Sequence, residues 1–154
     1  MFIGNPGLKC QFKEPKQVAT KQNREENTEF TPKFDDNGLI PAIAQDARTG
    51  QVLMVAYMNR QSLDVTIQSG YATYFSRSRQ KLWKKGEESG HRQKVQQILV
   101  DCDQDCLIIK VSVDAGQCHV GYQSCFYRAL KKNSDKELEF IAEKVYDPEE
   151  AYKK

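Results

Sequence analysis

The fold is decided by residues 39–58, LIPAIAQDARTGQVLMVAYM, in which two apolar runs flank a short polar segment. That segment, DARTG at 46–50, has the composition of a turn that joins two antiparallel strands. The stretch therefore predicts a β-hairpin. Upstream, residues 1–33 mix charged residues, Asn, Gln, Thr and prolines without apolar periodicity, so we expect a partly mobile N-terminal extension before a single domain at 34–154.

The chain after the hairpin predicts further strands and a helix. Asn59 is a candidate N-cap and Gly70 a candidate C-cap, which predicts a helix of about three turns over 59–70. The aromatic run at 71–76 predicts a strand, and the basic residues at 77–93 predict a loop too long for a simple hairpin connection. The other expected elements are strands at 95–100 and 106–113, strand and turn at 116–130, an alternating segment at 138–146 and a short helix at 147–152. We expect an α+β fold that is mainly β, with mixed or antiparallel sheets and one or two helices.

Composition limits the classes of function. The 154 residues are 39% hydrophobic and 29% charged, which fits one compact domain with a core. A net charge of +2 provides no bulk attraction to nucleic acid or membrane, so the function must depend on a local site. No signal peptide and no run of about 18 apolar residues is present, so we expect a cytoplasmic protein whose five cysteines stay reduced.

Three aspartates form the first candidate metal site. Asp101, Asp103 and Asp105 alternate in DCDQD, and on an extended backbone their carboxylates would project from one face about 7 Å apart. Such hard oxygen ligands suit Mg²⁺ or Ca²⁺. An EF-hand is excluded, because the sixth and twelfth positions from Asp101 are Cys106 and Ser112. The alternative is a solvated acidic turn between two strands.

Three cysteines form the second candidate site. Cys102, Cys118 and Cys125 are spaced C-x15-C-x6-C, and three thiolates would hold Zn²⁺ with one coordination position open, as in catalytic sites. Cys106 would instead close a structural zinc site, and buried cysteines that act as small apolar residues are a further alternative. On a straight strand Cys102 faces away from the aspartates, which implies two separate metal sites. The other two thiols would then come from elsewhere in the fold or from a second subunit.

The remaining candidates are two histidines and a basic loop. His119 follows a candidate ligand and is a candidate proton donor or acceptor, while His91 is either a substrate contact or an exposed side chain. The loop carries guanidinium and hydroxyl groups that suit phosphate, although it lacks the Walker A order and a solvated basic loop is the alternative. Its candidate substrate-binding residues are Ser76, Arg77, Ser78, Arg79, Lys81, Trp83, Lys84, Lys85 and Ser89, with Trp83 a candidate to stack on a purine.

Four stretches in unbroken order resemble phosphoribosyl-AMP cyclohydrolase, the enzyme of histidine biosynthesis that opens the adenine ring of N1-phosphoribosyl-AMP. The stretches are LIPAIAQDARTGQVLMVAYMNRQSL, FSRSRQKLWKKGEESGHRQKV, LVDCDQDCLIIKV and CHVGYQSCFYR. They cover about residues 38–128. The motifs SRSR-x-x-LW-x-KGE, DCD-x-D and CH-x-G-x-x-SCFYR are too long and unusual for chance agreement.

The resemblance implies two metal ions per subunit of an intertwined homodimer. Mg²⁺ would bind the three aspartates, and Zn²⁺ would bind Cys102 from one subunit with Cys118 and Cys125 from the other. Cys106 stands where the family commonly has a small residue and is not counted as a ligand. His91 stands where the family has His or Asn, which favours substrate contact. The chain is expected to be monofunctional, without the pyrophosphatase domain that some family members carry downstream.

The implied reaction is hydrolysis of the N1–C6 bond by zinc-activated water, which yields the formimino-carboxamide ribotide intermediate. His119 would transfer the proton, and Mg²⁺ would anchor a phosphate or orient the substrate. A zinc nucleobase deaminase is a weaker alternative, because its H-x-E and P-C-x-x-C signature is absent. A noncatalytic zinc-stabilised binding module remains an alternative that requires a closed four-cysteine site with Cys106.

Overall fold

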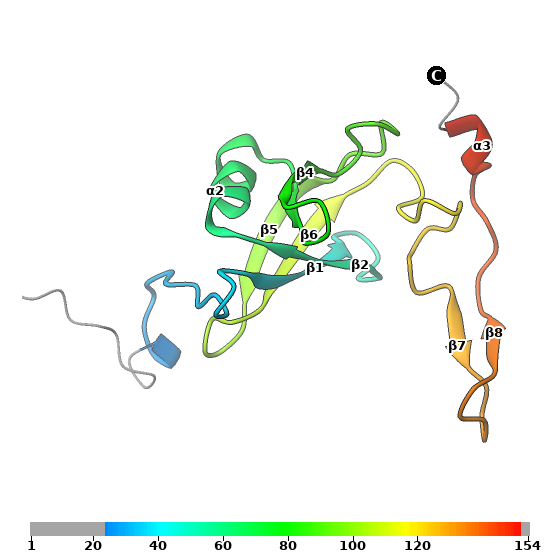
Figure 1. Ribbon diagram of the computed structural model, residues 1–154, viewed down its shortest axis with the longest axis horizontal. Helices are drawn as coiled ribbons and strands as arrows, with labels where there is room; N and C mark the ends of the chain where they lie inside the picture. The colour runs from blue at the N-terminus through cyan, green and yellow to red at the C-terminus, as the bar shows by residue number, and fades with distance from the viewer. Residues whose placement is uncertain (1–23, 152–154) are drawn as a thin grey trace, which may run out of the picture.

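The computed structural model describes residues 24–151, which are organised around a four-stranded mixed sheet (Figure 1). The sheet has the order β2-β1-β6-β5, and its strands are β1 (Ile40–Asp46), β2 (Val52–Met58), β5 (Lys94–Val100) and β6 (Leu107–Ser112). β1–β2 and β5–β6 are antiparallel pairs, whereas β1 and β6 pair in parallel. The predicted hairpin at 39–58, the two later strands and the mainly β fold class are confirmed.

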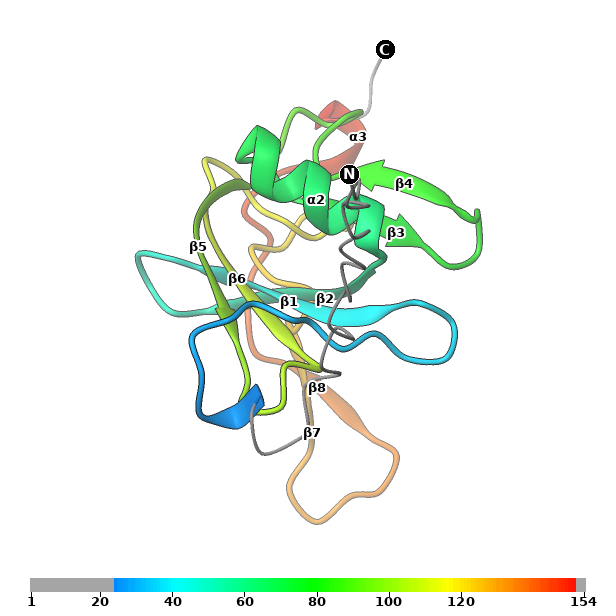
Figure 2. The same ribbon diagram turned by 90° about the vertical axis from the view of Figure 1, so that its left-hand side faces the viewer.

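Helix α2 (Arg60–Ser69) follows the first hairpin directly, as the sequence predicts. The Asn59 side chain accepts a hydrogen bond from the Ser62 amide at 2.8 Å, and the Ser62 hydroxyl accepts one from the Asn59 amide at 2.9 Å. This reciprocal pair satisfies two amides of the first turn. Gly70, at a φ of 69°, ends the helix in the left-handed region. The helix lies over one face of the sheet and buries Leu63 there (Figure 2).

The predicted long basic loop contains a strand, so this expectation was wrong. β3 (Thr73–Ser76) and β4 (Lys81–Lys84) pair antiparallel around a four-residue turn at 77–80. β4, KLWK, alternates charged and apolar residues, but four residues among many charges are too few to show the period of a strand. Trp83 lies opposite Tyr74 and packs against its ring with centroids 5.6 Å apart.

The C-terminal part forms a further hairpin that projects from the main body (Figures 1 and 2). It consists of β7 (Arg128–Leu130) and β8 (Leu138–Phe140), followed by helix α3 (Pro148–Ala151). Only the first three residues of the predicted alternating segment are a strand. The apolar side chains more than half exposed here are Phe126, Leu130, Leu138, Phe140, Ile141 and Val145. We call this exposed group the apolar arm.

The core lies between the sheet, α2 and the β3–β4 hairpin. Its fully buried side chains include Ile40, Leu53, Met58, Leu63, Tyr74, Leu107, Ile109 and Val111. Residues 24–33 of the predicted extension run beside the turn between β5 and β6, while residues 1–23 lie outside the described part of the chain. Among the described residues, no helix has the length and apolar character needed to cross a membrane.

Candidate functional site

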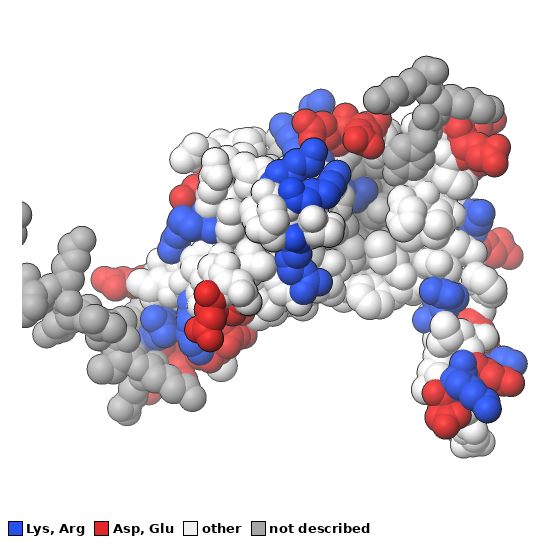
Figure 3. All heavy atoms as spheres, viewed as in Figure 1, with Lys and Arg blue, Asp and Glu red and all other residues white. Residues whose placement is uncertain are grey.

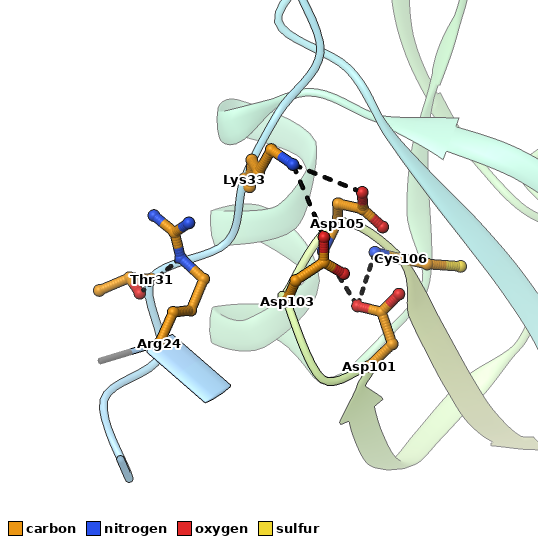
Figure 4. Close-up of polar contacts among 7 residues, drawn as sticks. All are labelled: Arg24, Thr31, Lys33, Asp101, Asp103, Asp105 and Cys106. Carbon is orange, nitrogen blue, oxygen red and sulfur yellow. Dashed lines mark hydrogen bonds and ion pairs between the residues drawn. The ribbon is translucent and has the colours of Figure 1, made fainter. Parts of the chain in front are cut away.

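The aspartate turn, residues 101–106, joins β5 to β6 and gathers three carboxylates (Figure 4). One oxygen from each of Asp101, Asp103 and Asp105 lies within 4.8 Å of the others. Asp101 Oδ1 shapes the turn by accepting hydrogen bonds from the amides of Asp105 at 2.9 Å and Cys106 at 3.1 Å. The predicted extended arrangement was therefore wrong, because the backbone folds back on Asp101. Three converging carboxylates suit one hard cation better than an extended row does.

A cationic side chain already lies at the aspartate turn. The Lys33 ammonium is 3.6 Å from Asp103 and 3.7 Å from Asp105 (Figure 4). Gln104, only 4% exposed, holds this segment in place, because its side-chain oxygen accepts from the Thr31 amide at 2.8 Å and its backbone oxygen from the Lys33 amide at 2.7 Å. Sequence reasoning missed both Lys33 and Gln104. A contact between residues more than seventy positions apart leaves no local pattern to detect.

Two of the candidate zinc ligands lie together in residues 116–125, which we call the thiol loop. Burial, and then the neighbouring Cys118 thiol that shares a hydrogen bond with it, raise the pKa of Cys125 to about 11. The loop is fixed to the start of β2, where the Cys125 amide donates to the Leu53 carbonyl at 2.8 Å and the Ser124 hydroxyl to the Val52 carbonyl at 2.7 Å. A thiol that resists deprotonation, as Cys125 does, becomes a good ligand only when a cation stabilises its thiolate.

The third candidate ligand, Cys102, lies at the opposite end of the sheet. It is exposed in the aspartate turn, after the last residue of β5, whereas the thiol loop follows β6 and contacts the start of β2. The seven residues of β5 separate the two ends by about 20 Å at the usual rise of a strand. Within the part of the chain that the structure describes, only the three aspartates form a metal-ligating group of three. One chain therefore does not bring the three thiols together.

A cavity of about 330 Å³ lies beside the thiol loop. Lys85, only 8% exposed, stands in its wall. Burial lowers the pKa of Lys85, and the nearby Cys125 and Cys118 thiols oppose that shift. His119 reaches the cavity from the thiol loop, whereas the rest of the lining comes from residues 79–89. The lining consists of Arg79, Lys81, Leu82, Trp83, Lys85, Gly86, Glu87, Glu88, Ser89 and His119.

A wider, more open cavity of about 650 Å³ adjoins the first. Arg79 and Trp83 line both, and the Arg77 guanidinium lies 4.0 Å from the centre of the Tyr57 ring in the second. Lys and Arg side chains gather over the β3–β4 hairpin in the middle of the face seen in Figure 3. Ser76, Arg77, Ser78, Arg79, Trp83, Lys85 and Ser89, all predicted substrate-binding residues, line one cavity or the other. Sequence reasoning missed Tyr57, because it lies in the first hairpin and carries no loop signal.

His91 is placed differently from His119. Its ring packs edge-on against Tyr146 with centroids 4.8 Å apart, and it is not part of either cavity lining. The turn before it is tight: Gly86 has a φ of 78°, and a Cβ there would lie 2.4 Å from the backbone of His91. Glycine at 86 thus permits the chain to double back behind the cavity wall.

Known proteins match this chain closely. The family model described as phosphoribosyl-AMP cyclohydrolase matches residues 54–127. A protein of Methanococcoides burtonii named phosphoribosyl-AMP cyclohydrolase is 59% identical over 122 residues, which are 79% of this chain and 96% of that protein. Proteins of the same name from Prosthecochloris aestuarii and Methanospirillum hungatei are 52% identical over 137 residues and 54% identical over 128 residues. These matches cover 89% and 83% of this chain, and 98% and 93% of the two proteins.

Proposed function

The chain belongs to the phosphoribosyl-AMP cyclohydrolase family and is an enzyme, and from that premise we propose that it hydrolyses the N1–C6 bond of 1-(5-phosphoribosyl)-AMP. The product is the formimino-aminoimidazole carboxamide ribotide intermediate of histidine biosynthesis, made in the cytoplasm. The single observation that carries this proposal is the composition of the smaller cavity. His119, next to a pair of adjacent thiols, shares it with basic and aromatic side chains that suit a phosphorylated purine.

The two adjoining cavities would bind the substrate. Its two 5′-phosphates call for guanidinium, ammonium and hydroxyl donors, which both linings provide. Trp83 borders both cavities, so its ring is placed to stack on the purine between the phosphates. Residues proposed to hold the phosphates are Ser76, Arg77, Ser78, Arg79, Lys85 and Ser89. Two well-separated anchors would orient the ring before the reaction.

The thiol loop fits zinc, because it would supply two of the three protein ligands of the ion. Cys118 and Cys125 are adjacent, and both thiols act on Lys85 in the direction that favours a positive charge beside them, against the lowering of its pKa by burial. We propose that Cys102 of a second subunit completes the set. A zinc ion held there would supply an activated water at physiological pH. His119 lines the cavity beside these thiols and would carry the proton between that water and the departing N1 nitrogen.

The apolar arm supports the proposed homodimer. Phe140 is 68% exposed and Ile141 61%, and large apolar side chains grouped this way normally meet a partner. The arm projects from the body at the end of the sheet where the thiol loop lies (Figure 1). A two-fold partner whose aspartate turn lies near this end would bring Cys102 to the thiol loop, which no rearrangement of a single sheet can do.

Magnesium fits the aspartate turn, because three carboxylate oxygens converge there. In the proposed dimer this turn accompanies Cys102 to the partner's cavity, so the cation would meet a substrate phosphate. The carboxylates of Asp101, Asp103 and Asp105 would hold it, with waters completing its shell. His91 remains a predicted substrate contact, and the dimer would have to bring substrate to it.

The Lys33 ammonium should compete with the cation for Asp103 and Asp105. We expect Lys33→Gln to tighten Mg²⁺ binding about threefold, a modest gain because these ion pairs are exposed. Isothermal titration with Mg²⁺ measures this. Lys131→Gln is the matched control, since Lys131 forms an exposed pair with Glu137 on the hairpin of β7 and β8. We expect no change of Mg²⁺ affinity in Lys131→Gln. An unchanged or weaker Mg²⁺ affinity in Lys33→Gln would contradict the proposed competition.

Cys106→Ala separates the enzyme from the noncatalytic binding module. Burial, and then Asp101 and Asp105, raise the pKa of the Cys106 thiol, which makes it a poor source of thiolate. We therefore expect zinc content and activity to stay unchanged in this variant. Zinc analysis alongside the activity assay checks both. Loss of zinc would favour a closed four-cysteine site.

Direct turnover tests the proposed activity. Purified full-length protein with Zn²⁺ and Mg²⁺ is incubated with 1-(5-phosphoribosyl)-AMP, and the ultraviolet spectrum is followed as the purine ring opens. We expect a change of spectrum that saturates with substrate and requires both metals. No spectral change under these conditions would refute the proposed reaction.

A further inference from the structure

The smaller cavity is built from two chain segments. Other contacts within the protein must fix the distance between these segments. Its wall comes from residues 79–89, whereas His119 arrives from the thiol loop. In the sequence, His119 is thirty positions from Ser89, the nearest residue of that wall. A misplacement of about 1 Å between a proton-transfer group and its substrate can cost about 100-fold in rate.

A buried relay of side-chain hydrogen bonds connects the two segments. The Tyr74 hydroxyl donates to Gln93 Oε1 at 2.7 Å, Gln93 Nε2 donates to Gln117 Oε1 at 3.0 Å, and Gln117 Nε2 donates to the Ala115 carbonyl at 2.8 Å. Tyr74 and Gln93 are completely buried, and Gln117 is 2% exposed. Each donor points the same way along the relay, and reversing the Gln117 amide would break both of its bonds, because Gln93 Nε2 only donates and the Ala115 carbonyl only accepts.

The first end of the relay is attached to the cavity wall. The Gln93 carbonyl accepts from the Ala72 amide at 3.0 Å, and the Ala72 carbonyl accepts from the Lys85 amide at 3.2 Å. The Tyr74 ring packs against Trp83. Both Lys85 and Trp83 line the cavity, so the relay begins in the same rigid unit that would hold the substrate.

The second end of the relay is attached to the thiol loop. Gln117 directly precedes Cys118 and His119. Its backbone amide donates to the Gln123 backbone carbonyl at 3.1 Å within that loop. A residue outside the thiol loop also holds its backbone, since the Tyr146 hydroxyl donates to the Cys118 carbonyl at 2.6 Å. The backbone of Cys118 is thereby held on both sides.

Polar groups suit this task better than apolar packing. A buried amide without a partner is costly, so the chain avoids any arrangement that breaks the relay. Apolar side chains would allow the loop to slide among several packings of similar energy. Buried polar networks that are fully satisfied favour one geometry for this reason.

We propose that Gln93 and Gln117 are positioning residues that set the distance between the thiol loop, with Cys118 and His119, and the substrate-binding wall. This inference rests on the proposed function, because it assigns the relay a role in that reaction. Neither glutamine contacts the cavity itself, so their effect passes through the groups they hold.

The test compares Gln117→Leu with a control of matched burial. Gln117→Leu keeps the volume but breaks the relay; we expect kcat to fall about 100-fold while KM stays within about threefold. In protein loaded with Co²⁺ in place of zinc, we also expect the thiolate-to-cobalt absorption band to shift or weaken. Thr66→Val is the control, since the buried Thr66 hydroxyl bonds to Ser62 and Thr73 away from the thiol loop. It should lower the unfolding temperature yet leave kcat and the cobalt band unchanged.

Tyr74→Phe keeps the inference testable if Gln117→Leu does not fold. It removes one hydroxyl at the far end of the relay, and we expect a fall in kcat of about five- to tenfold at constant KM. An unchanged kcat in both relay variants, or an equal loss in Thr66→Val, would overturn the inference. If the wild-type protein shows neither turnover nor a cobalt–thiolate band, the proposed function itself fails and the inference fails with it.

Discussion

Two variants that are each inactive, Cys102→Ala and Cys118→Ala, should together regain about a quarter of the wild-type activity when their subunits are mixed in equal amounts. Each substitution removes one proposed zinc ligand from every site of its own homodimer. In a mixed dimer, one site combines both defects, while the other receives an intact Cys102 and an intact Cys118. Half of the dimers formed at random are mixed, and half of their sites work.

The physical reason lies in the strand that separates these residues. Cys102 and Cys118 stand at opposite ends of β5 and β6, so one chain would have to bridge about 20 Å to bind zinc with both. Subunits with two different affinity tags are unfolded together and refolded with zinc, and the mixture is assayed for turnover and zinc content. Mixed dimers purified from it through both tags should have about half of the wild-type activity, because half of their sites work.

A matched pair controls for nonspecific recovery. Cys118→Ala mixed with Cys125→Ala should regain nothing, because both ligands belong to the same thiol loop and every site in the mixed dimer lacks one. Recovery in this control, or none with Cys102→Ala, would show that the zinc ligands are not shared between subunits.

His119→Ala should lower kcat by about 10²- to 10⁴-fold, the usual contribution of a positioned proton-transfer group. His119 is the only histidine among the described residues that lines the cavity, and the chain contains just one other. KM and zinc content should change little, because the phosphate donors and thiols remain. Steady-state kinetics with metal analysis measures all three quantities.

His91→Ala is the control for His119→Ala. The His91 ring packs on Tyr146 outside the cavity linings, so its loss should leave proton transfer intact and act mainly on KM. A full kcat in His119→Ala would contradict its role. An equal loss of kcat in His91→Ala with unchanged KM would show that the effect is not specific to His119.

The parts of the fold that the sequence predicted depend on neighbouring residues. The polar turn at 46–50 and the reciprocal hydrogen bonds of Asn59 with Ser62 each involve residues only a few positions apart, so the local sequence predicts them. β4 was missed because its four residues are strand only through pairing with β3. The aspartate turn was misjudged as extended because its shape depends on Asp101 bonding the amides of Asp105 and Cys106.

The sequence by itself determined the family, the kinds of ligand and the local elements, because motifs and caps are short-range patterns. Only the tertiary structure decided that the aspartates converge, that Cys102 lies a strand length from the thiol loop, and that Gln93 meets Gln117 inside the protein. Those relations join residues far apart in the chain. They arise from strand pairing and from the cost of burying an unpaired amide, and neither leaves a local trace in the order of residues.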